Sequence, residues 1–173
     1  MYPVLVVGRT PGSAADALVG FLLQRMTDEQ FLQVALALAR EAETAEEVPV
    51  GAIVVLNNEV IGRGRNSPVA SHDPTAHAEM IALREGALHI RNYRLEGATI
   101  YTTLEPCVMC AGALVAARLK RLVFGARDLR FGGVRSKFRL ADSDLLNHQV
   151  EVVEGVLGAE CSELLRDFFA RRR

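Results

Sequence analysis

The first long periodic pattern of hydrophobic residues begins just after Met26. Hydrophobic side chains recur there at the spacing of one helical face, at Phe31, Val34, Ala35, Leu38 and Ala42. Thr27 and Gln30 fit a capping box, in which each side chain satisfies a backbone N–H group at a helix start. The pattern therefore predicts a helix from Thr27 to about Ala45.

Short hydrophobic segments after this helix predict strands. Residues 52–56 and 60–64 are joined through Asn57-Asn58. Because asparagine tolerates the positive φ angles of a tight turn, we expect a β-hairpin here. Three further segments are predicted to be strands, at residues 98–103, 122–125 and 150–153.

Three more helices are predicted between and after these strands. Asp73-Pro74 offers an N-cap followed by proline at the first helical position, which predicts a helix to about residue 89. The next helix is expected over residues 106–118. The last, residues 159–171, has a hydrophobic face made of Cys161, Leu164, Leu165, Phe168 and Phe169. This element order indicates a three-layer α/β/α domain around a mixed central sheet of about five strands.

The chain is long enough for one well-buried domain, and nothing in the sequence divides it. Of its 173 residues, 50% are hydrophobic and 24% are charged, the balance of an ordinary globular protein. We expect one domain over residues 27–173 and an N-terminal tail over residues 1–26. Because the first helix follows Met26 directly, our hypothesis is that translation starts there and that the tail is disordered or a mis-assigned start. If the protein expressed from its native gene has an intact mass that includes residues 1–25, this hypothesis is wrong.

Hydrophobic runs and cysteine usage point to the interior of the cell. The longest runs, such as residues 34–39 and 52–56, are far below the ~18 residues needed to cross a bilayer. The first 26 residues do not fit a secretory signal, so we expect a cytoplasmic protein without membrane contact. Two of the three cysteines are three positions apart, which favours metal binding or catalysis over a disulfide framework.

The charges are unevenly distributed, although the formal net charge is only -1. Residues 118–139 hold eight of the 20 basic residues and one acid, whereas residues 28–47 hold six acids and one base. Two interpretations are open. The segments form solvated faces or a subunit contact, or the basic one is a phosphate-binding surface beside an active site.

Two short motifs carry candidate metal chemistry: His77-x-Glu79, and Pro106-Cys107-x-x-Cys110. A catalytic zinc typically has three protein ligands and leaves the fourth position for water, and His77, Cys107 and Cys110 match that count. In a first helical turn, Cys107 and Cys110 would lie on one face, where the helix dipole favours thiolates. Glu79 supplies the carboxylate that makes water a nucleophile at neutral pH.

Each motif alone has a plainer interpretation. A lone H-x-E is usually coincidence, and a lone C-x-x-C is more often a structural zinc site or a redox pair. A structural site would need a fourth ligand, but Cys161 is expected to pack on the hydrophobic face of the last helix. Positions i and i+2 do not face each other on a regular helix, so His77 and Glu79 share a site only near its start. The ordered pair of motifs favours a catalytic zinc.

Over residues 28–172 the chain resembles the bacterial tRNA adenosine deaminases of the cytidine-deaminase-like fold. The two motifs match the H-x-E…P-C-x-x-C signature of zinc deaminases. The similarity includes residues 48–52, 72–79, 104–112 and 124–128. Residues 125–128 and the final Phe168-Phe169 followed by arginines resemble the tRNA-acting members more than the free-base deaminases.

The resemblance implies deamination of adenosine to inosine at the wobble position of a tRNA anticodon stem-loop, by a homodimer with one Zn²⁺ per subunit. Glu79 would shuttle protons. The base would be held by Asn66 and the backbone N–H of Ala78. The anticodon loop would pass Asp128, Phe168 and Phe169, although the phenylalanines also fit a packing role. Candidates for the RNA backbone are Arg127, Arg130, Arg135, Lys137, Arg171 and Arg172.

The chain also departs from the family pattern. Residues 129–136 replace a loop that is usually rich in glycine and alanine and include Phe131, with Arg135 at what is commonly a glycine; Arg65 and Ser67 differ as well. Two alternatives remain. One is a deaminase of a free base or nucleotide such as guanine, cytosine or dCMP, which would use the same zinc chemistry. The other is a non-catalytic, zinc-stabilised RNA-binding protein, in which Glu79 would be dispensable.

Overall fold

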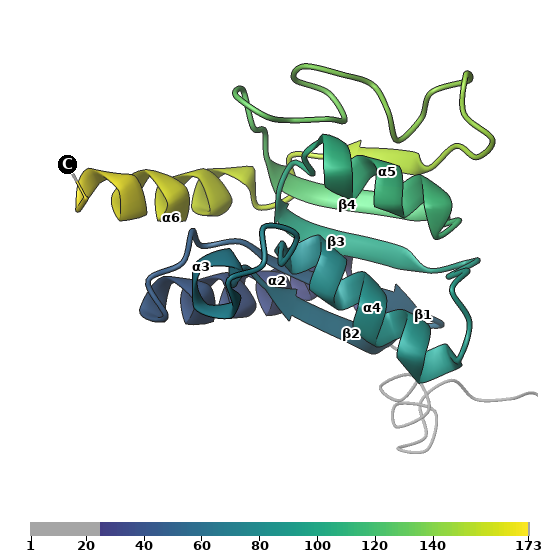
Figure 1. The fold of residues 1–173 in the computed structure, drawn as a ribbon, viewed down its shortest axis with the longest axis horizontal. Helices are drawn as coiled ribbons and strands as arrows, with labels where there is room; N and C mark the ends of the chain where they lie inside the picture. The colour runs from purple at the N-terminus through teal and green to yellow at the C-terminus, as the bar shows by residue number, and fades with distance from the viewer. Residues whose placement is uncertain (1–24, 173) are drawn as a thin grey trace, which may run out of the picture.

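The computed structural model describes residues 25–172, which are built around one mixed five-stranded sheet (Figure 1). The strand order is β2-β1-β3-β4-β5. The strands are β1 Gly51–Leu56, β2 Glu59–Arg65, β3 Thr99–Leu104, β4 Arg121–Ala126 and β5 Glu151–Glu154. Strand β1 pairs antiparallel with β2 and β3, whereas β3, β4 and β5 run parallel. The predicted mixed sheet is confirmed.

Helices cover both faces of the sheet, which confirms the three-layer prediction (Figure 1). Helices α2 Asp28–Thr44 and α6 Gly158–Ala170 pack on one face, and α4 Ala78–Ile90 and α5 Val108–Ala116 on the other. A single turn, α3 Pro68–Ser71, was not expected, because four residues are too few to show a helical period. In the described residues, no helix is long and apolar enough to span a bilayer.

The start of α2 is fixed by its capping box, as predicted. The Thr27 hydroxyl accepts from the backbone N–H of Gln30 at 3.3 Å, and the Gln30 side chain accepts from the Thr27 N–H at 2.9 Å. The next residue, Asp28, pairs with Arg121 of β4 through two bonds of 2.7 and 2.8 Å. These contacts join the N-terminal end of α2 to the sheet.

The predicted hairpin and C-terminal helix are present with small shifts in their ends. Asn57 and Asn58 both have positive φ, 51° and 67°, as a tight hairpin turn requires. On α6, Cys161 is buried, which confirms its packing role. Phe168 is 4% exposed but Phe169 is 47% exposed, so placing both on the buried face is wrong. Helix α6 extends beyond the ends of the strands (Figure 1). Adjacent residues of a helix point about 100° apart, so one ring can face the interior while the next faces solvent.

Two helices begin later than predicted. Helix α4 starts at Ala78, because the Asp73 carboxylate accepts from the N–H and hydroxyl of Thr75, both at 2.7 Å, and so forms a local turn instead of a cap. Helix α5 starts at Val108 and ends at Ala116, short of residue 118. The predictions for residues 1–24 lie outside the described residues and stay predictions, as does the division of the chain at residue 27.

Candidate active site

Three potential metal ligands meet where α4 and α5 begin. The donor atoms of His77, Cys107 and Cys110 all lie within 4.8 Å of one another, and the His77 Nδ1 is 3.6 Å from each sulfur. In a tetrahedral site with the usual Zn–N and Zn–S bond lengths, a nitrogen and a sulfur ligand are about 3.6 Å apart. The three donors are therefore spaced to hold zinc.

The ligands sit at helix caps, which differs from the predicted first-turn arrangement. His77 is the N-cap of α4 (φ −74°, ψ 151°) and Cys107 is the N-cap of α5 (φ −70°, ψ 175°). Both have extended backbone, so only Cys110 is helical. Side chains two positions apart point in different directions when both residues are helical. Because His77 lies outside the helix, its side chain and that of Glu79 can point toward the same site.

A close helix–strand contact fixes the position of the first residue of α4. Gly64 of β2 lies directly beneath this residue, and a side chain there would overlap the Ala78 carbonyl. Two residues later, the Asn66 Oδ1 accepts from the Ala78 N–H at 3.0 Å. The two predicted base-binding groups are thus bonded to each other. The amide NH₂ of Asn66 is left as the donor that can reach a base.

Glu79 is almost completely buried beside the ligand cluster, with 3% of its surface exposed. Burial raises its pKa to about 7, although its own backbone N–H and the neighbouring His77 and Cys110 favour the charged form. A carboxyl group with a pKa near neutrality can both accept and release a proton at physiological pH. The geometry brings this group to the three ligands, as the motif spacing predicted.

The two sulfurs are electrostatically distinct. A hydrogen bond from the Cys110 thiol, followed by one from His77, lowers the pKa of Cys107 to about 4 despite its partial burial. The same bond raises the pKa of Cys110, and Cys107 in turn raises the pKa of His77. The Cys107 sulfur is therefore ready as a thiolate, the form that binds metals.

A buried carboxylate without a role predicted from the sequence lies next to the second motif. Glu105, 2% exposed, follows β3 and accepts hydrogen bonds from a loop more than 20 positions later. The donors are the backbone N–H groups of Asp128, Val134, Arg135 and Ser136 and the Ser136 hydroxyl. An acidic residue directly after a strand of buried residues was the only sequence signal for it.

Residues 128–136, called the anchored loop below, are held against the metal ligands. Gly132 forms a bridge with Cys107, and the Gly133 N–H donates to the Pro106 carbonyl at 2.8 Å. A side chain on Gly132 would overlap the Glu105 carboxylate, so this close approach requires glycine. The anchored loop therefore forms one wall beside the ligand cluster.

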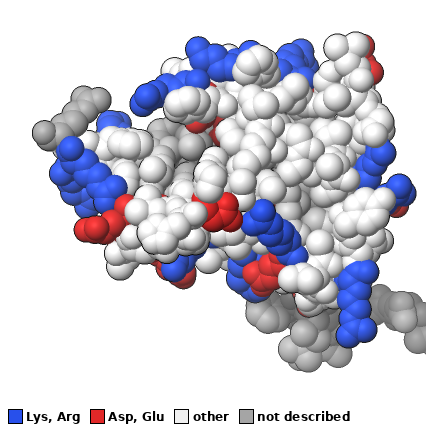
Figure 2. Space-filling view, in the orientation of Figure 1, with Lys and Arg blue, Asp and Glu red and all other residues white. Residues whose placement is uncertain are grey.

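The predicted RNA-contacting residues fall into two groups, visible as basic surface over residues 127–148 at the top of Figure 2 and over the end of α6 at its left. Several already have partners. Arg127 pairs with Glu154 at 2.8 Å, Arg135 with Asp142 at 3.0 Å and Arg171 with Glu43. The Asp128 carboxylate accepts from the N–H groups of Arg130 and Phe131 within the anchored loop, and Arg172 lies over the Phe168 ring.

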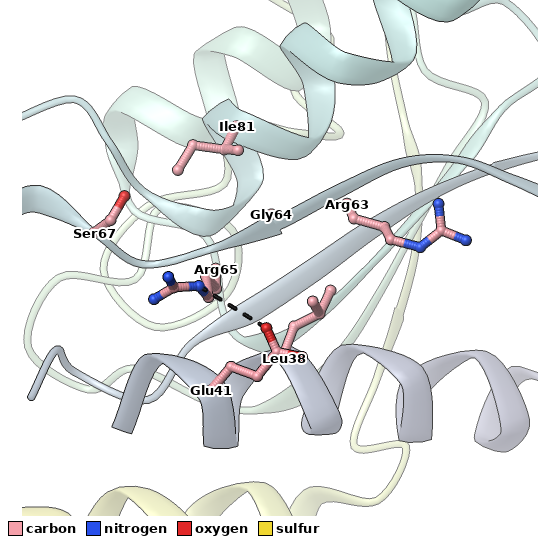
Figure 3. A pocket seen from close by; sticks show the side chains of 7 residues that line it. All are labelled: Leu38, Glu41, Arg63, Gly64, Arg65, Ser67 and Ile81. Carbon is pink, nitrogen blue, oxygen red and sulfur yellow. Dashed lines mark ion pairs between the residues drawn. The ribbon is translucent and has the colours of Figure 1, made fainter. Parts of the chain in front are cut away.

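Arg65 and Ser67, which differ from the family pattern, line a pocket of about 290 Å³ between α2 and β2 (Figure 3). Its lining consists of Leu38, Glu41, Arg63, Gly64, Arg65, Ser67 and Ile81. Arg65 points toward Glu41, from which its Nε is 3.9 Å distant. None of the three ligands or Glu79 lines this pocket, so it is separate from the cluster.

Comparison with known proteins agrees with this geometry. Residues 25–126 match the model of the cytidine and deoxycytidylate deaminase zinc-binding region. The tRNA-specific adenosine deaminase of Haemophilus influenzae is 52% identical over 147 residues, 84% of this chain and 85% of that protein.

Solved structures of a tRNA deaminase and of a free-base deaminase share this fold. A chain from structural studies of A-to-I editing by tRNA:A34 deaminases at the wobble position of transfer RNA superposes with a TM-score of 0.76 and 41% identity, covering 78% of this chain and 98% of that one. The guanine deaminase of Nitrosomonas europaea gives 0.73 at 25% identity, over 98% of both chains. The chain belongs to the cytidine and deoxycytidylate deaminase family and, within it, to the tRNA-specific adenosine deaminases.

Proposed function

We propose that this protein is a cytoplasmic, zinc-dependent hydrolase that converts adenosine to inosine at the wobble position of a tRNA anticodon. The observation that carries the proposal is the buried Glu79 carboxyl beside the His77, Cys107 and Cys110 donors. The names of the relatives support tRNA as substrate, since the similar proteins are tRNA-specific adenosine deaminases. The basic surface of Figure 2 is consistent with an RNA partner.

The reaction consumes one water and releases one ammonia. His77, Cys107 and Cys110 would hold one zinc per subunit. When bound, zinc supplies a Lewis acid that lowers the pKa of water toward neutrality. Glu79 takes a proton from the water that attacks C6 of adenine, and delivers protons to N1 and to the departing ammonia. Asn66 orients the base through its amide NH₂, while its Oδ1 holds the Ala78 N–H.

The RNA backbone would contact the basic residues around the anchored loop and the end of α6. Arg130 and Lys137 are exposed and, within residues 25–172, have no ion-pair partner. Arg127 and Arg171 remain candidates because exposed ion pairs contribute little stability, so a phosphate can replace the partner carboxylate. Arg135 and Arg172 are also proposed, although Arg135 pairs with Asp142 through side chains only 19% and 22% exposed and Arg172 donates to the Glu46 carbonyl at 2.9 Å. Phe169 is exposed enough to line the path of the anticodon loop, whereas Phe168 packs beneath Arg172.

The substrate assignment is tested by offering an anticodon stem-loop with a wobble adenosine alongside free adenine, guanine, cytosine and dCMP. We expect ammonia release from the stem-loop alone, and none from a control stem-loop with guanosine at that position. Binding should weaken steeply with salt, since each phosphate contact to single-stranded RNA contributes a slope of about −0.7 in log K against log salt. Deamination of only the free compounds would overturn the assignment in favour of a free-base or nucleotide deaminase.

Metal content gives a second test. We expect about one zinc per chain in the purified protein, and loss of both zinc and turnover when Cys107 is replaced by serine, because the thiolate ligand is removed. The matched control is Cys161→Ala, in a buried cysteine outside the cluster, which should keep its zinc. Measurement uses metal analysis beside ammonia release. A Cys107→Ser protein with full zinc and activity would contradict the ligand set.

We also propose that two copies associate through the outer face of α4 and α5. A groove of about 270 Å³ runs there between the helices, with a mostly apolar lining of Met80, Leu83, Arg84, Ala87, Tyr93, Leu95, Ala113, Ala116 and Ala117. Light scattering should give twice the chain mass of 18.9 kDa. Ala116→Arg should give the single mass, because it buries a charge in the contact, while Ala37→Arg on the exposed side of α2 should not. A monomeric wild-type protein would contradict the proposal.

A further inference from the structure

The anchored loop presents an aromatic ring to solvent beside the metal ligands. Phe131 is 64% exposed, and its neighbour Gly132 forms the bridge with Cys107. Bridged residues have Cα atoms about 5 Å apart and sequence neighbours about 4 Å apart, so the Phe131 Cα is within roughly 10 Å of the Cys107 Cα. A ring at this distance is in reach of a nucleotide next to one whose base is seated at the cluster.

The ring is held on a fixed backbone. The Phe131 N–H donates to the Asp128 carboxylate at 3.1 Å, and the Gly132 N–H donates to the Asp128 carbonyl at 2.9 Å. Glu105 then fixes the rest of the anchored loop from below. Because the backbone is ordered before binding, a ligand that stacks on the ring does not have to order the loop.

The charges around the ring match a nucleic acid. The Arg130 guanidinium lies 5.4 Å from the centroid of the Phe131 ring. Lys137 is exposed, and its backbone N–H donates to the carbonyl of Gly132, the next residue after Phe131, at 3.0 Å. Cations that follow a phosphate backbone, interleaved with an aromatic ring on which a base stacks, are the pattern of single-stranded nucleic acid sites. Unpaired RNA loops are bound in this way because their bases can leave the stack.

We propose that Phe131 stacks on an unpaired nucleotide that flanks the reacting adenosine, while Arg130 neutralises the adjoining phosphate. The inference rests on the proposed function, whose substrate it refines: the enzyme binds the flanking nucleotide by its π face, and so with little base preference. Phe131 is a binding residue for the RNA and does not touch the reacting atoms.

The test compares Phe131→Ala with Phe131→Tyr, and with Leu129→Ala as matched control, an aliphatic side chain 72% exposed on the same loop. We expect Phe131→Ala to raise KM and Kd for the stem-loop by about tenfold, the usual effect of removing one base–aromatic stack. The kcat should stay within about twofold, since the chemistry is untouched. Phe131→Tyr and Leu129→Ala should behave as wild type, and all variants should keep the wild-type Tm because both sites are exposed.

A 2-aminopurine placed beside the wobble position gives a direct signature. Its fluorescence should be quenched on binding to the wild type and to Phe131→Tyr, and less by Phe131→Ala. If the wild type deaminates the stem-loop but Phe131→Ala has unchanged KM and unchanged quenching, the inference is wrong and the proposed function stands. An equal rise in KM in Leu129→Ala would also contradict the inference alone. A wild-type protein that leaves the stem-loop unreacted would overturn the proposed function and this inference together.

Discussion

Replacing Glu79 by glutamine is expected to reduce kcat on the anticodon stem-loop by about 10²- to 10⁴-fold, the contribution of a well-placed proton-transfer group. The carboxyl group has to take a proton from the attacking water and pass protons to N1 and to ammonia. A glutamine amide has nearly the same shape and can do neither. Because Glu79 is buried and its pKa is raised to about 7 by that burial, a neutral side chain fits the site without loss of stability.

The measurement combines ammonia release with metal analysis and thermal unfolding. Glu79→Gln should retain one zinc per chain and the wild-type Tm, which separates a proton-transfer role from a structural one. The control is Glu85→Gln, an exposed carboxylate of the same helix that accepts from the Arg63 N–H at 3.1 Å. Full turnover in Glu79→Gln would contradict the proton-transfer role of Glu79. A wild-type protein that holds zinc and binds the stem-loop without releasing ammonia would instead support the alternative of a non-catalytic RNA-binding protein.

The chemistry of the site could be predicted from the sequence because motif spacing is local. His77 and Cys107 are N-caps, and Glu79 and Cys110 lie in the first turns that follow, so the members of each motif stay together wherever their helix begins within a few residues. The exact helix starts could not be predicted. An aspartate before proline can cap a helix or close a turn, and Asp73 is used for the turn by Thr75.

Long-range contacts account for the rest. Glu105 accepts hydrogen bonds from residues 23 to 31 positions later, so its burial depends on a loop that carries no periodic signal. Phe168 and Phe169 are the same residue type and are adjacent in the sequence. Phe168 is 4% exposed and Phe169 is 47% exposed, because adjacent residues of a helix point about 100° apart and only one of them faces the rest of the molecule. Such differences depend on how elements meet, which a hydrophobic pattern does not encode.

Removing the Glu105 carboxylate is the second change with a large expected effect. Glu105→Ala leaves the N–H groups of the anchored loop without their acceptor. Each donor that stays buried without a partner lowers the stability of the protein by about 1–3 kcal/mol. We expect the free energy of unfolding to fall by about 3 kcal/mol or more. The KM for the stem-loop should rise at least about tenfold, because the wall beside Cys107 is no longer held. Urea unfolding and steady-state kinetics measure the two effects.

Two milder variants keep this prediction testable if the alanine protein does not fold. Glu105→Gln keeps one acceptor oxygen but presents an amide NH₂ to donors, and Ser136→Ala removes a single hydrogen bond. The expected order of stability is wild type, Ser136→Ala, Glu105→Gln, Glu105→Ala, with KM rising in the same order. A Glu105→Gln protein with wild-type stability and KM would show that the anchored loop is held by other contacts.

The pH dependence of stability gives an independent readout of the same carboxylate. Burial alone would raise the pKa of Glu105, but the hydrogen bonds from Ser136, Arg135 and Asp128 together lower it below the ordinary 4.5. A group with a lowered folded-state pKa stabilises the protein above its unfolded-state pKa, and this contribution is lost as the pH falls through the folded value. The wild type should therefore lose stability below about pH 4.5, and Glu105→Gln, which cannot titrate, should lose less over that interval. In the described residues, Glu105 forms no hydrogen bond with the metal ligands or with Glu79. If Glu105→Gln loses less stability than the wild type below about pH 4.5 and keeps its zinc, the effect therefore belongs to the anchored loop.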